Sequence, residues 1–192
     1  LSTAGPFARY SDLLVQACVE QGTHYTDITG ENHWVRTLID KHHENASLKG
    51  VRIVPSCGYD SIPSDIGTFF AVSQFNKPVK RVELFQEMQG GASGGTIETA
   101  FSMGKLSKEM RDPFLLNPEN SSTEEQRKYS KDMMRIEKIE ELDGWSGMFV
   151  MAAGNTRVVR RTAALMEQNQ NSYGANFTFG EYGLHKTKKL AR

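Results

Sequence analysis

The chain has 192 residues, enough to bury a hydrophobic core, and 38% of them are apolar, which is ordinary for a soluble globular protein. Its 23 basic and 23 acidic side chains cancel, so bulk charge gives no attraction to nucleic acid or to an anionic membrane. No run of about 18 apolar residues occurs, and no transmembrane helix is expected. The two cysteines, Cys18 and Cys57, form no C-x-x-C pair and no disulfide framework, which favours a reducing, intracellular setting.

Short apolar runs alternate with helical patterns over the first 54 residues. Residues 1–4 look like the end of a strand, and Gly5-Pro6 looks like the turn after it. The expected elements that follow are a helix at 11–21, a strand at 25–28, a helix at 29–49 and a strand at 51–54. This alternation predicts a parallel sheet with right-handed crossovers, as in a doubly wound domain. Because the chain starts in mid-strand and without Met, we expect it to be an internal piece of a longer polypeptide.

The pattern changes from residue 64 onward. The expected elements there are a helix at 65–75, a long strand at 79–89, a helix after the GGASGGT segment, a helix at 156–169 and a strand at 175–183. The exposed face of the long strand favours an antiparallel sheet. Residues 107–143 are polar and charged, and the sequence leaves open whether they form an exposed helix or a mobile lid. We therefore predict a first domain at 1–66 and an α+β second domain at 67–192.

The helix expected at 156–169 would turn Val159 and its apolar neighbours inward. Arg157, Arg160 and Arg161 could hold a carboxylate or phosphate group, but a solvated helix face is the interpretation that we favour. The five histidines show no H-E-x-x-H or comparable ligand spacing, so no metal site is predicted.

Two carboxylates, Asp27 and Glu31, lie where the strand at 25–28 ends and the next helix begins. Both would stand at the carboxyl edge of the sheet, where they could bind a ribose hydroxyl, a substrate amine or a catalytic water. The alternative is that Asp27 or Thr29 caps the helix and Glu31 complements its dipole. The sequence leaves both interpretations open.

A loop rich in reactive side chains follows the strand at 51–54. Cys57 is a candidate nucleophile, Tyr59 a candidate proton donor and Asp60 a candidate base or binding group. The alternative is a structural cysteine in a turn, with Ser64 and Asp65 capping the next helix. Carboxyl ends of strands are where ligands bind in α/β folds, so this loop is a predicted wall of an active site.

The glycine-rich segment GGASGGT, residues 90–96, joins a strand to a helix. Its backbone N–H groups could face an anion at the helix N-terminus, which would make this a phosphate-binding element. It is neither a Walker A motif nor a dinucleotide fingerprint after a first strand. A flexible connection with a Ser or Thr cap is the alternative.

Taken together and in order, several motifs resemble one known family. They are GPF, ACVEQGTHYTDITGE, GVRIVPSCGYDSIPSD, SGGT and FVMAAGNTRVVRRTAAL. The combination resembles the saccharopine dehydrogenase-like oxidoreductases, a group that includes the trans-acting enoyl reductases of lipid synthesis. The resemblance covers most of the chain outside 107–143. Saccharopine-forming enzymes have a G-x-D-P-G type of loop where this chain has G-Y-D-S-I-P, which favours the lipid-directed branch.

The resemblance implies an α/β fold: the C-terminal half of a Rossmann-like doubly wound parallel sheet, followed by an α+β second domain. The family's G-x-x-G-x-x-G loop on the first strand is absent from this sequence. The cofactor, NAD or NADP, is therefore expected for the full-length parent, with weak or no binding by this piece. The choice between NAD and NADP would depend on residues upstream of Leu1.

The resemblance also assigns expected roles to individual residues. The candidates on the cofactor side are Gly5, Pro6, Asp27, Gly30, Glu31, Cys57 and Gly58. The substrate-side loop of the second domain would be Ser93, Gly94, Gly95 and Thr96. Catalytic residues stay unassigned, with Asp60, Tyr59 and Ser61 as candidates. In a site for hydride transfer, Asp60 and Ser61 would position the reactants, and Cys57 is not needed as a nucleophile.

The sequence thus predicts part of an NAD(P)-dependent oxidoreductase that reduces a small-molecule or lipid-like enoyl or keto substrate. The alternative is a non-catalytic binding or scaffold protein that keeps the oxidoreductase fold. No nucleic-acid partner is expected, and a homodimer is left open. The expected location is intracellular, cytoplasmic or organellar, with association at a membrane surface left open.

Overall fold

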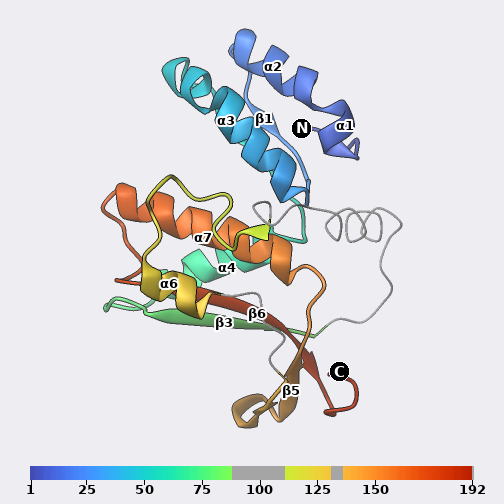
Figure 1. Ribbon diagram of the computed structural model, residues 1–192, viewed down its shortest axis with the longest axis vertical. Helices are drawn as coiled ribbons and strands as arrows, with labels where there is room; N and C mark the ends of the chain where they lie inside the picture. Colours follow the sequence, from blue (N-terminus) through green and yellow to red (C-terminus); the bar gives the residue numbers. More distant parts are fainter. Residues whose placement is uncertain (88–110, 131–135, 192) are drawn as a thin grey trace.

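The computed structural model of the chain describes residues 1–87, 111–130 and 136–191 (Figure 1). The N-terminal unit contains three helices and two short strands. They are α1 (Phe7–Tyr10), α2 (Asp12–Glu20), β1 (Tyr25–Thr26), α3 (Asn32–Leu48) and β2 (Ile53–Val54). Helix α3 has apolar residues at helical spacing, and it buries Trp34, Val35 and Leu38 on one side.

The strands of the N-terminal unit are parallel, as the sequence predicts. Tyr25 of β1 pairs with Ile53 of β2 in a parallel register, and helix α3 forms the connection between them. Ser2 forms a further parallel bridge with Asp27, so residues near the N-terminus run alongside β1. The carboxyl ends of all three segments therefore meet at one edge, which is the edge where the site was predicted.

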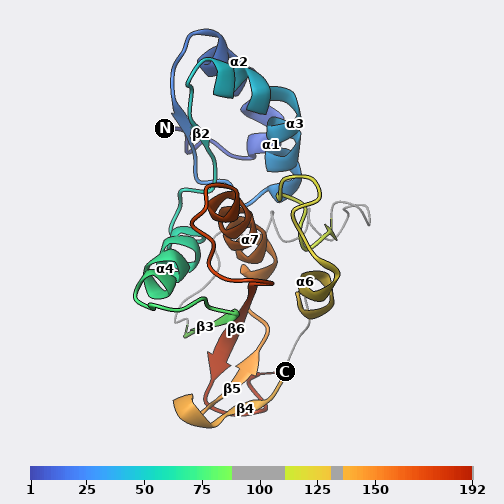
Figure 2. The ribbon, with the colours of Figure 1, turned by 90° about the vertical axis from the view of Figure 1, so that its left-hand side faces the viewer.

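The second unit is built on a four-stranded sheet in the order β3-β6-β5-β4. Its elements are α4 (Ile62–Ser73), β3 (Arg81–Gln86), α6 (Glu124–Tyr129), β4 (Lys138–Ile139), the short 3₁₀ helix η2 (Glu140–Leu142), β5 (Gly144–Gly147), α7 (Ala152–Gln168) and β6 (Thr178–His185). Helices α4 and α7 lie between this sheet and the N-terminal unit (Figures 1 and 2). The mixed α/β class is confirmed, and the predicted boundary after residue 66 falls within α4 and stays a prediction.

One prediction about the sheet is wrong. Strand β3 was expected to join an antiparallel sheet, but it pairs in parallel with β6 along its whole length, from Arg81↔Thr178 to Gln86↔Gly183. Antiparallel pairing occurs instead between β6 and β5 and between β5 and β4. Among the described residues, β6 is the one strand that pairs with β3. An alternating pattern indicates that one face of a strand is exposed, and it does not reveal the direction of the neighbouring strand.

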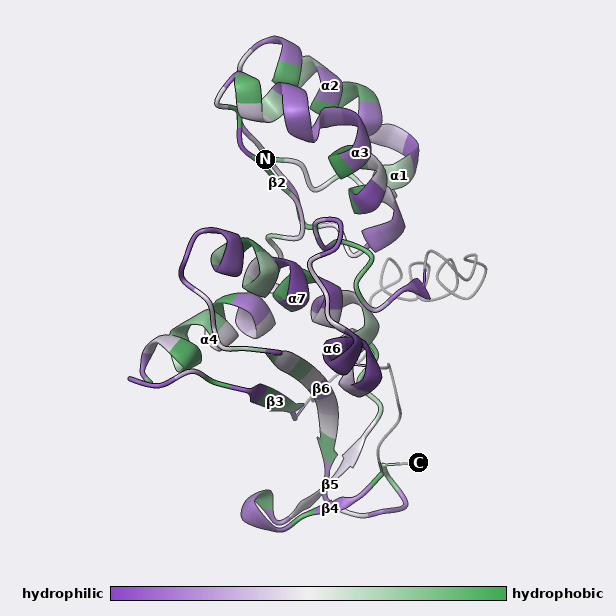
Figure 3. Ribbon diagram, turned by 60° about the vertical axis from the view of Figure 1, so that its left-hand side comes forward, coloured by the Kyte–Doolittle hydropathy of each residue, from purple (hydrophilic) through white to green (hydrophobic). Residues whose placement is uncertain are grey.

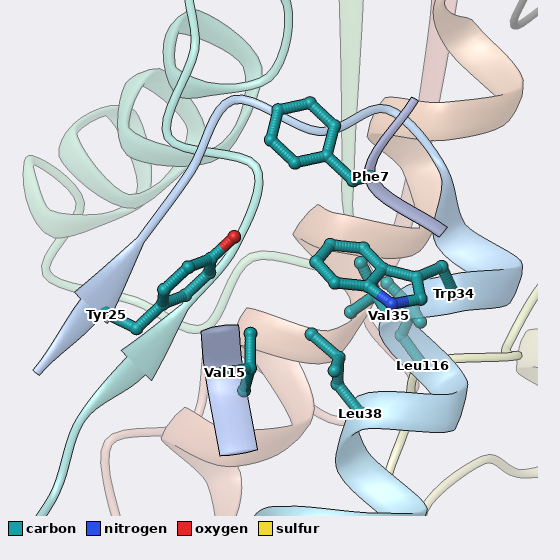
Figure 4. Close-up of a cluster of buried hydrophobic side chains, with 7 residues drawn as sticks. All are labelled: Phe7, Val15, Tyr25, Trp34, Val35, Leu38 and Leu116. Carbon is teal, nitrogen blue, oxygen red and sulfur yellow. The ribbon is translucent and has the colours of Figure 1, made fainter. Parts of the chain in front are cut away.

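Helix α7 joins the two hydrophobic cores. The core of the N-terminal unit contains Phe7, Val15, Tyr25, Trp34, Val35, Leu38 and Leu116 (Figure 4). The core of the second unit is formed by Val159, Tyr173, Phe177 and Phe179. Val158 packs against the first core, whereas Val159 next to it belongs to the second. The two units are therefore held together by burial of apolar surface on both sides of one helix.

The charged segment at 107–143 contributes to the core. Residues 88–110 and 131–135 lie outside the described residues, but Phe114 and Leu116 are 5% and 1% exposed, respectively. Helix α6 in the same segment is hydrophilic along its length (Figure 3), and a capping box at Thr123 starts it. The sequence leaves open an exposed helix or a mobile lid; residues 124–129 form a helix, whereas residues 114 and 116 are buried.

The predicted solvated face of arginines on α7 is also wrong. Arg157 and Arg160 are each 4% exposed. Arg157 donates to the carbonyl of Arg111 at 2.8 Å, and Arg160 donates to the carbonyls of Pro113 and Phe179 at 2.9 and 3.1 Å. Buried guanidinium groups are tolerated because backbone carbonyls accept their hydrogen bonds. The same arginines thereby hold the 111–117 segment on α7.

Candidate functional site

Three predicted site segments meet at the carboxyl edge of the parallel strands. The backbone N–H of Cys57 donates to the carbonyl of Asp27 at 2.7 Å, which joins the loop after β2 to the loop after β1. The backbone N–H of Phe7, just after the Gly5-Pro6 turn, donates to the Glu31 carboxylate at 2.7 Å. The turn, the 27–31 loop and the 56–61 loop therefore form one continuous surface, the common surface.

The Asp27 side chain is fully buried, and it lies where the loops that form this surface meet. Its carboxylate accepts hydrogen bonds from the Tyr25 hydroxyl and the Thr29 N–H at 2.9 Å and from the Ser56 N–H at 3.0 Å. Burial raises the pKa of Asp27, although the donated hydrogen bonds oppose this shift. Through these hydrogen bonds the Asp27 carboxylate joins the end of β1 to the end of β2. Its role at this edge of the sheet is therefore structural.

The Glu31 carboxylate binds the N-terminal end of helix α1. Its two oxygens accept from the N–H groups of Phe7 and Ala8, at 2.7 and 3.1 Å, which are the first residues of α1. The N–H of Glu31 itself donates to the Thr29 hydroxyl at 3.0 Å. Unpaired N–H groups at a helix start favour a carboxylate, so Glu31 stabilises α1 and fixes the Gly5-Pro6 turn beside it.

The loop between β2 and α4 places its candidate groups in different environments. Tyr59 is 89% exposed and Asp60 is also exposed, whereas Ser61 is buried and donates to Oδ1 of Asn155 at 3.0 Å. The half-buried Cys57 thiol donates to the carbonyl of Val54 at 3.3 Å. The structure thus brings Cys57, Gly58 and Ser61 onto the common surface and leaves Tyr59 and Asp60 in solvent.

A buried polar network behind this loop was missed by the sequence analysis. Asn155 of α7 is fully buried, and its amide donates to Glu181 of β6 at 3.2 Å and to Ser64 of α4 at 3.3 Å. Ser64 donates to the same Glu181 oxygen at 2.8 Å, and Gln86 does so at 3.1 Å. Burial raises the pKa of Glu181, and these hydrogen bonds oppose the shift. The network connects the predicted site loop to the second sheet.

Ser64 and Asp65 do not cap α4, which corrects their predicted role. The helix starts after Ser61, whose side chain makes no capping hydrogen bond. Asp65 instead accepts from the Thr162 hydroxyl of α7 at 2.9 Å. Only the A-A-G-N-T segment of the resemblance pointed toward Asn155, and nothing local in the sequence pointed toward Glu181.

The predicted substrate-side loop, Ser93 to Thr96, lies outside the described residues, so its position stays a prediction. Within the three described ranges, no group of three His, Cys, Asp or Glu side chains could hold a metal ion. No helix in the same ranges is both long and apolar enough to cross a membrane.

The carboxylates of the common surface are already used in hydrogen bonds within the protein. Asp27 and Glu31 already accept hydrogen bonds from protein N–H groups. Gly5 and Gly30 have no side chain that would cover the surface, and a methyl group at Gly58 would lie 3.1 Å from Cβ of Ile28. The packing against Ile28 accounts for glycine at position 58. Small residues let a ligand approach the backbone closely, so the glycines are the members of the predicted set that could lie against a ligand.

The chain is similar to several curated mycobacterial proteins. It is 35% identical over 197 residues to a protein of Mycobacterium ulcerans named trans-acting enoyl reductase. Proteins of Mycobacterium tuberculosis and Mycobacterium bovis with the same name are 34% identical over 201 residues. Each match covers 94% of this chain and 46% of the relative, so the chain spans about half the length of these proteins. No protein-family model matches the chain, and no solved structure matches it.

Proposed function

We propose that this chain is part of an NAD(P)-dependent enoyl reductase of the saccharopine dehydrogenase-like family. The observation that carries the proposal is the identity of 34–35% over 94% of the chain to proteins named trans-acting enoyl reductase. The geometry supports it, because the segments expected beside the cofactor form one surface at the carboxyl ends of parallel strands.

In this proposal, residues 1–66 are the back half of a Rossmann-like domain, and residues 67–192 form most of an α+β domain for the substrate. The backbone at Gly5, Gly30 and Gly58 would line the cofactor, while Asp27 and Glu31 keep the three segments in register. The reduced nicotinamide, when bound, would supply a hydride to the double bond of an enoyl substrate. Ser61 would be a positioning residue, since its hydroxyl is fixed by Asn155.

The first experiment is titration of the full-length protein with NADH and NADPH, followed by fluorescence and calorimetry. Turnover is then followed as loss of the reduced cofactor in the presence of an α,β-unsaturated thioester. Binding of one cofactor and consumption of both reactants in equal amounts are expected. A folded full-length protein that binds neither cofactor would rule the proposal out.

A pair of glycine variants tests the role of the common surface. Gly58→Val would crowd Ile28, and we expect it to weaken cofactor binding by about tenfold or more, which corresponds to about 1.4 kcal/mol. Gly67→Ala is the matched control, because an added methyl group on α4 meets nothing within 4 Å. Equal cofactor affinities for the two variants would show that the 56–61 loop is not part of the cofactor site.

The alternative, a non-catalytic protein that keeps this fold, is favoured by one observation. Of the three catalytic candidates, Tyr59 and Asp60 are exposed and the Ser61 hydroxyl is already hydrogen-bonded. Asp60→Asn and Ser61→Ala distinguish the two functions in the full-length protein. A fall in kcat with unchanged cofactor binding supports catalysis, whereas cofactor binding without turnover of enoyl or keto substrates supports the alternative.

A further inference from the structure

A groove between the two units adjoins the surface described above at Ser56 and extends away from it along α3 and α7. It has a volume of about 410 Å³ and is lined by α3, β2 and α7 and by Leu116. Small-molecule sites commonly measure about 300–1,000 Å³. Most of the lining side chains are apolar, and they include Val35 and Leu38 of α3 and Leu165 of α7. The groove therefore has the size and the walls of a site for an apolar molecule.

One cation in this groove, Arg161, has no counter-ion among the residues that the structure describes. The half-buried guanidinium of Arg161 lines the groove and donates to the carbonyl of Leu116. No carboxylate in the described part of the chain forms an ion pair with Arg161. Burial lowers the pKa of Arg161, and the nearby guanidinium of Arg36 lowers it further. An anion placed against Arg161 would offset both the lost hydration and the repulsion between the two arginines.

The remaining ionisable groups of the groove are also mainly basic. His42, His43 and Arg52 line it together with Arg161, whereas Asp65 is the single acidic residue among its described lining. Asp65 accepts from Thr162 through one oxygen, and its other, buried oxygen has no hydrogen-bond partner among the described residues. Asp65 forms no described ion pair with Arg161. The Nε2 atom of His42 is buried and has no hydrogen-bond partner among the described residues. The charge balance thus favours an anionic ligand over a cationic one.

We propose that this groove binds a small soluble carboxylate with an apolar body. The apolar part lies between α3 and α7, and the carboxylate pairs with Arg161. The apolar walls stabilise the body through burial, and the guanidinium supplies two-point recognition of the carboxylate. This site does not depend on the proposed enoyl reductase activity, because none of the glycines assigned to the cofactor wall lines it.

The test is calorimetric titration of the 192-residue chain with decanoate below its micelle concentration, compared with decanol. Decanoate is expected to bind at least about tenfold more tightly, since its carboxylate alone can form a charge-assisted hydrogen bond with the guanidinium. Added salt should weaken the binding of decanoate and leave that of decanol unchanged. Equal affinities for the two probes, or no binding of either, would overturn the proposal.

Two variants and a control locate the site. Arg161→Gln should weaken decanoate binding by about tenfold or more and remove the preference over decanol. Ser47→Phe places a large side chain at an exposed position of the lining and should weaken both probes without touching Arg161. Arg9→Gln, on the exposed side of α1, should bind like the unaltered chain. Unaltered decanoate binding by a folded Arg161→Gln or Ser47→Phe chain would place binding elsewhere and refute this site.

Discussion

The Glu31 carboxylate accepts a 2.7 Å hydrogen bond from the backbone N–H of Phe7, 24 residues earlier in the chain. This contact joins the loop after β1 to the turn at Gly5-Pro6. It satisfies N–H groups that begin α1, and it does so at a side chain that is 7% exposed. A residue that the sequence offers as a ligand for ribose is therefore already a structural element of the same surface.

Replacing Glu31 should destabilise the fold. Glu31→Ala leaves the N–H groups of Phe7 and Ala8 without their acceptors, so a loss of about 1–3 kcal/mol of unfolding free energy is expected. Glu31→Gln keeps one acceptor oxygen and should lose less. Urea denaturation measures both. Glu44→Ala, at an exposed position of α3, is the control and should change stability by no more than about 0.5 kcal/mol. A Glu31→Ala chain as stable as this control would contradict the assignment.

Local patterns predicted most of the elements but few of the contacts between them. Apolar periodicity placed α2, α3, α4 and α7, and alternation placed β6, because these signals depend on neighbouring residues. The parallel partner of β3 lies almost one hundred positions away in sequence, as shown by Arg81↔Thr178. The link from Ser64 to Glu181 spans 117 positions. Hydropathy also treats arginine as a surface residue, so it could not reveal that Arg160 is buried.

Leu116 tests the unexpected role of the charged segment. Its side chain is 1% exposed and packs in the core of the N-terminal unit beside Val35 (Figure 4). Leu116→Ala should leave a cavity there and cost about 2–5 kcal/mol of unfolding free energy. Thermal and urea denaturation are the measurements. Leu48→Ala is the matched control, because Leu48 is 86% exposed at the end of α3. Equal stability of the two variants would show that residues 114–117 do not pack on this core.

Arg160 is expected to be needed for its geometry as well as its charge. Arg160→Met removes the hydrogen bonds to the carbonyls of Pro113 and Phe179 and should cost about 1.5–3 kcal/mol. Arg160→Lys should lose nearly as much, since an ammonium group cannot reproduce the planar fork of donors. The comparison is Arg127→Met, which breaks an exposed 3.2 Å pair with Asp112 and should cost less than about 1 kcal/mol. A Lys variant as stable as the unaltered chain would show that charge alone is sufficient.

Asp65 should make the stability of the chain depend on pH. Burial raises the pKa of this carboxyl from 3.8 to about 6, and the hydrogen bond from Thr162 opposes the shift. Between these values the folded chain holds more protons at Asp65 than the unfolded chain does. The stabilisation is therefore complete below pH 3.8 and is lost as the pH rises through about 6.

Asp65→Asn isolates this contribution. The amide oxygen can still accept from Thr162, but the side chain no longer titrates, so the variant should gain stability relative to the unaltered chain as the pH rises. The gain should reach up to about 3 kcal/mol above pH 6. Urea denaturation at several pH values measures the difference between the two chains, which cancels the titration of Asp27 and Glu181. Parallel curves for the two chains across this range would show that folding does not raise the pKa of Asp65.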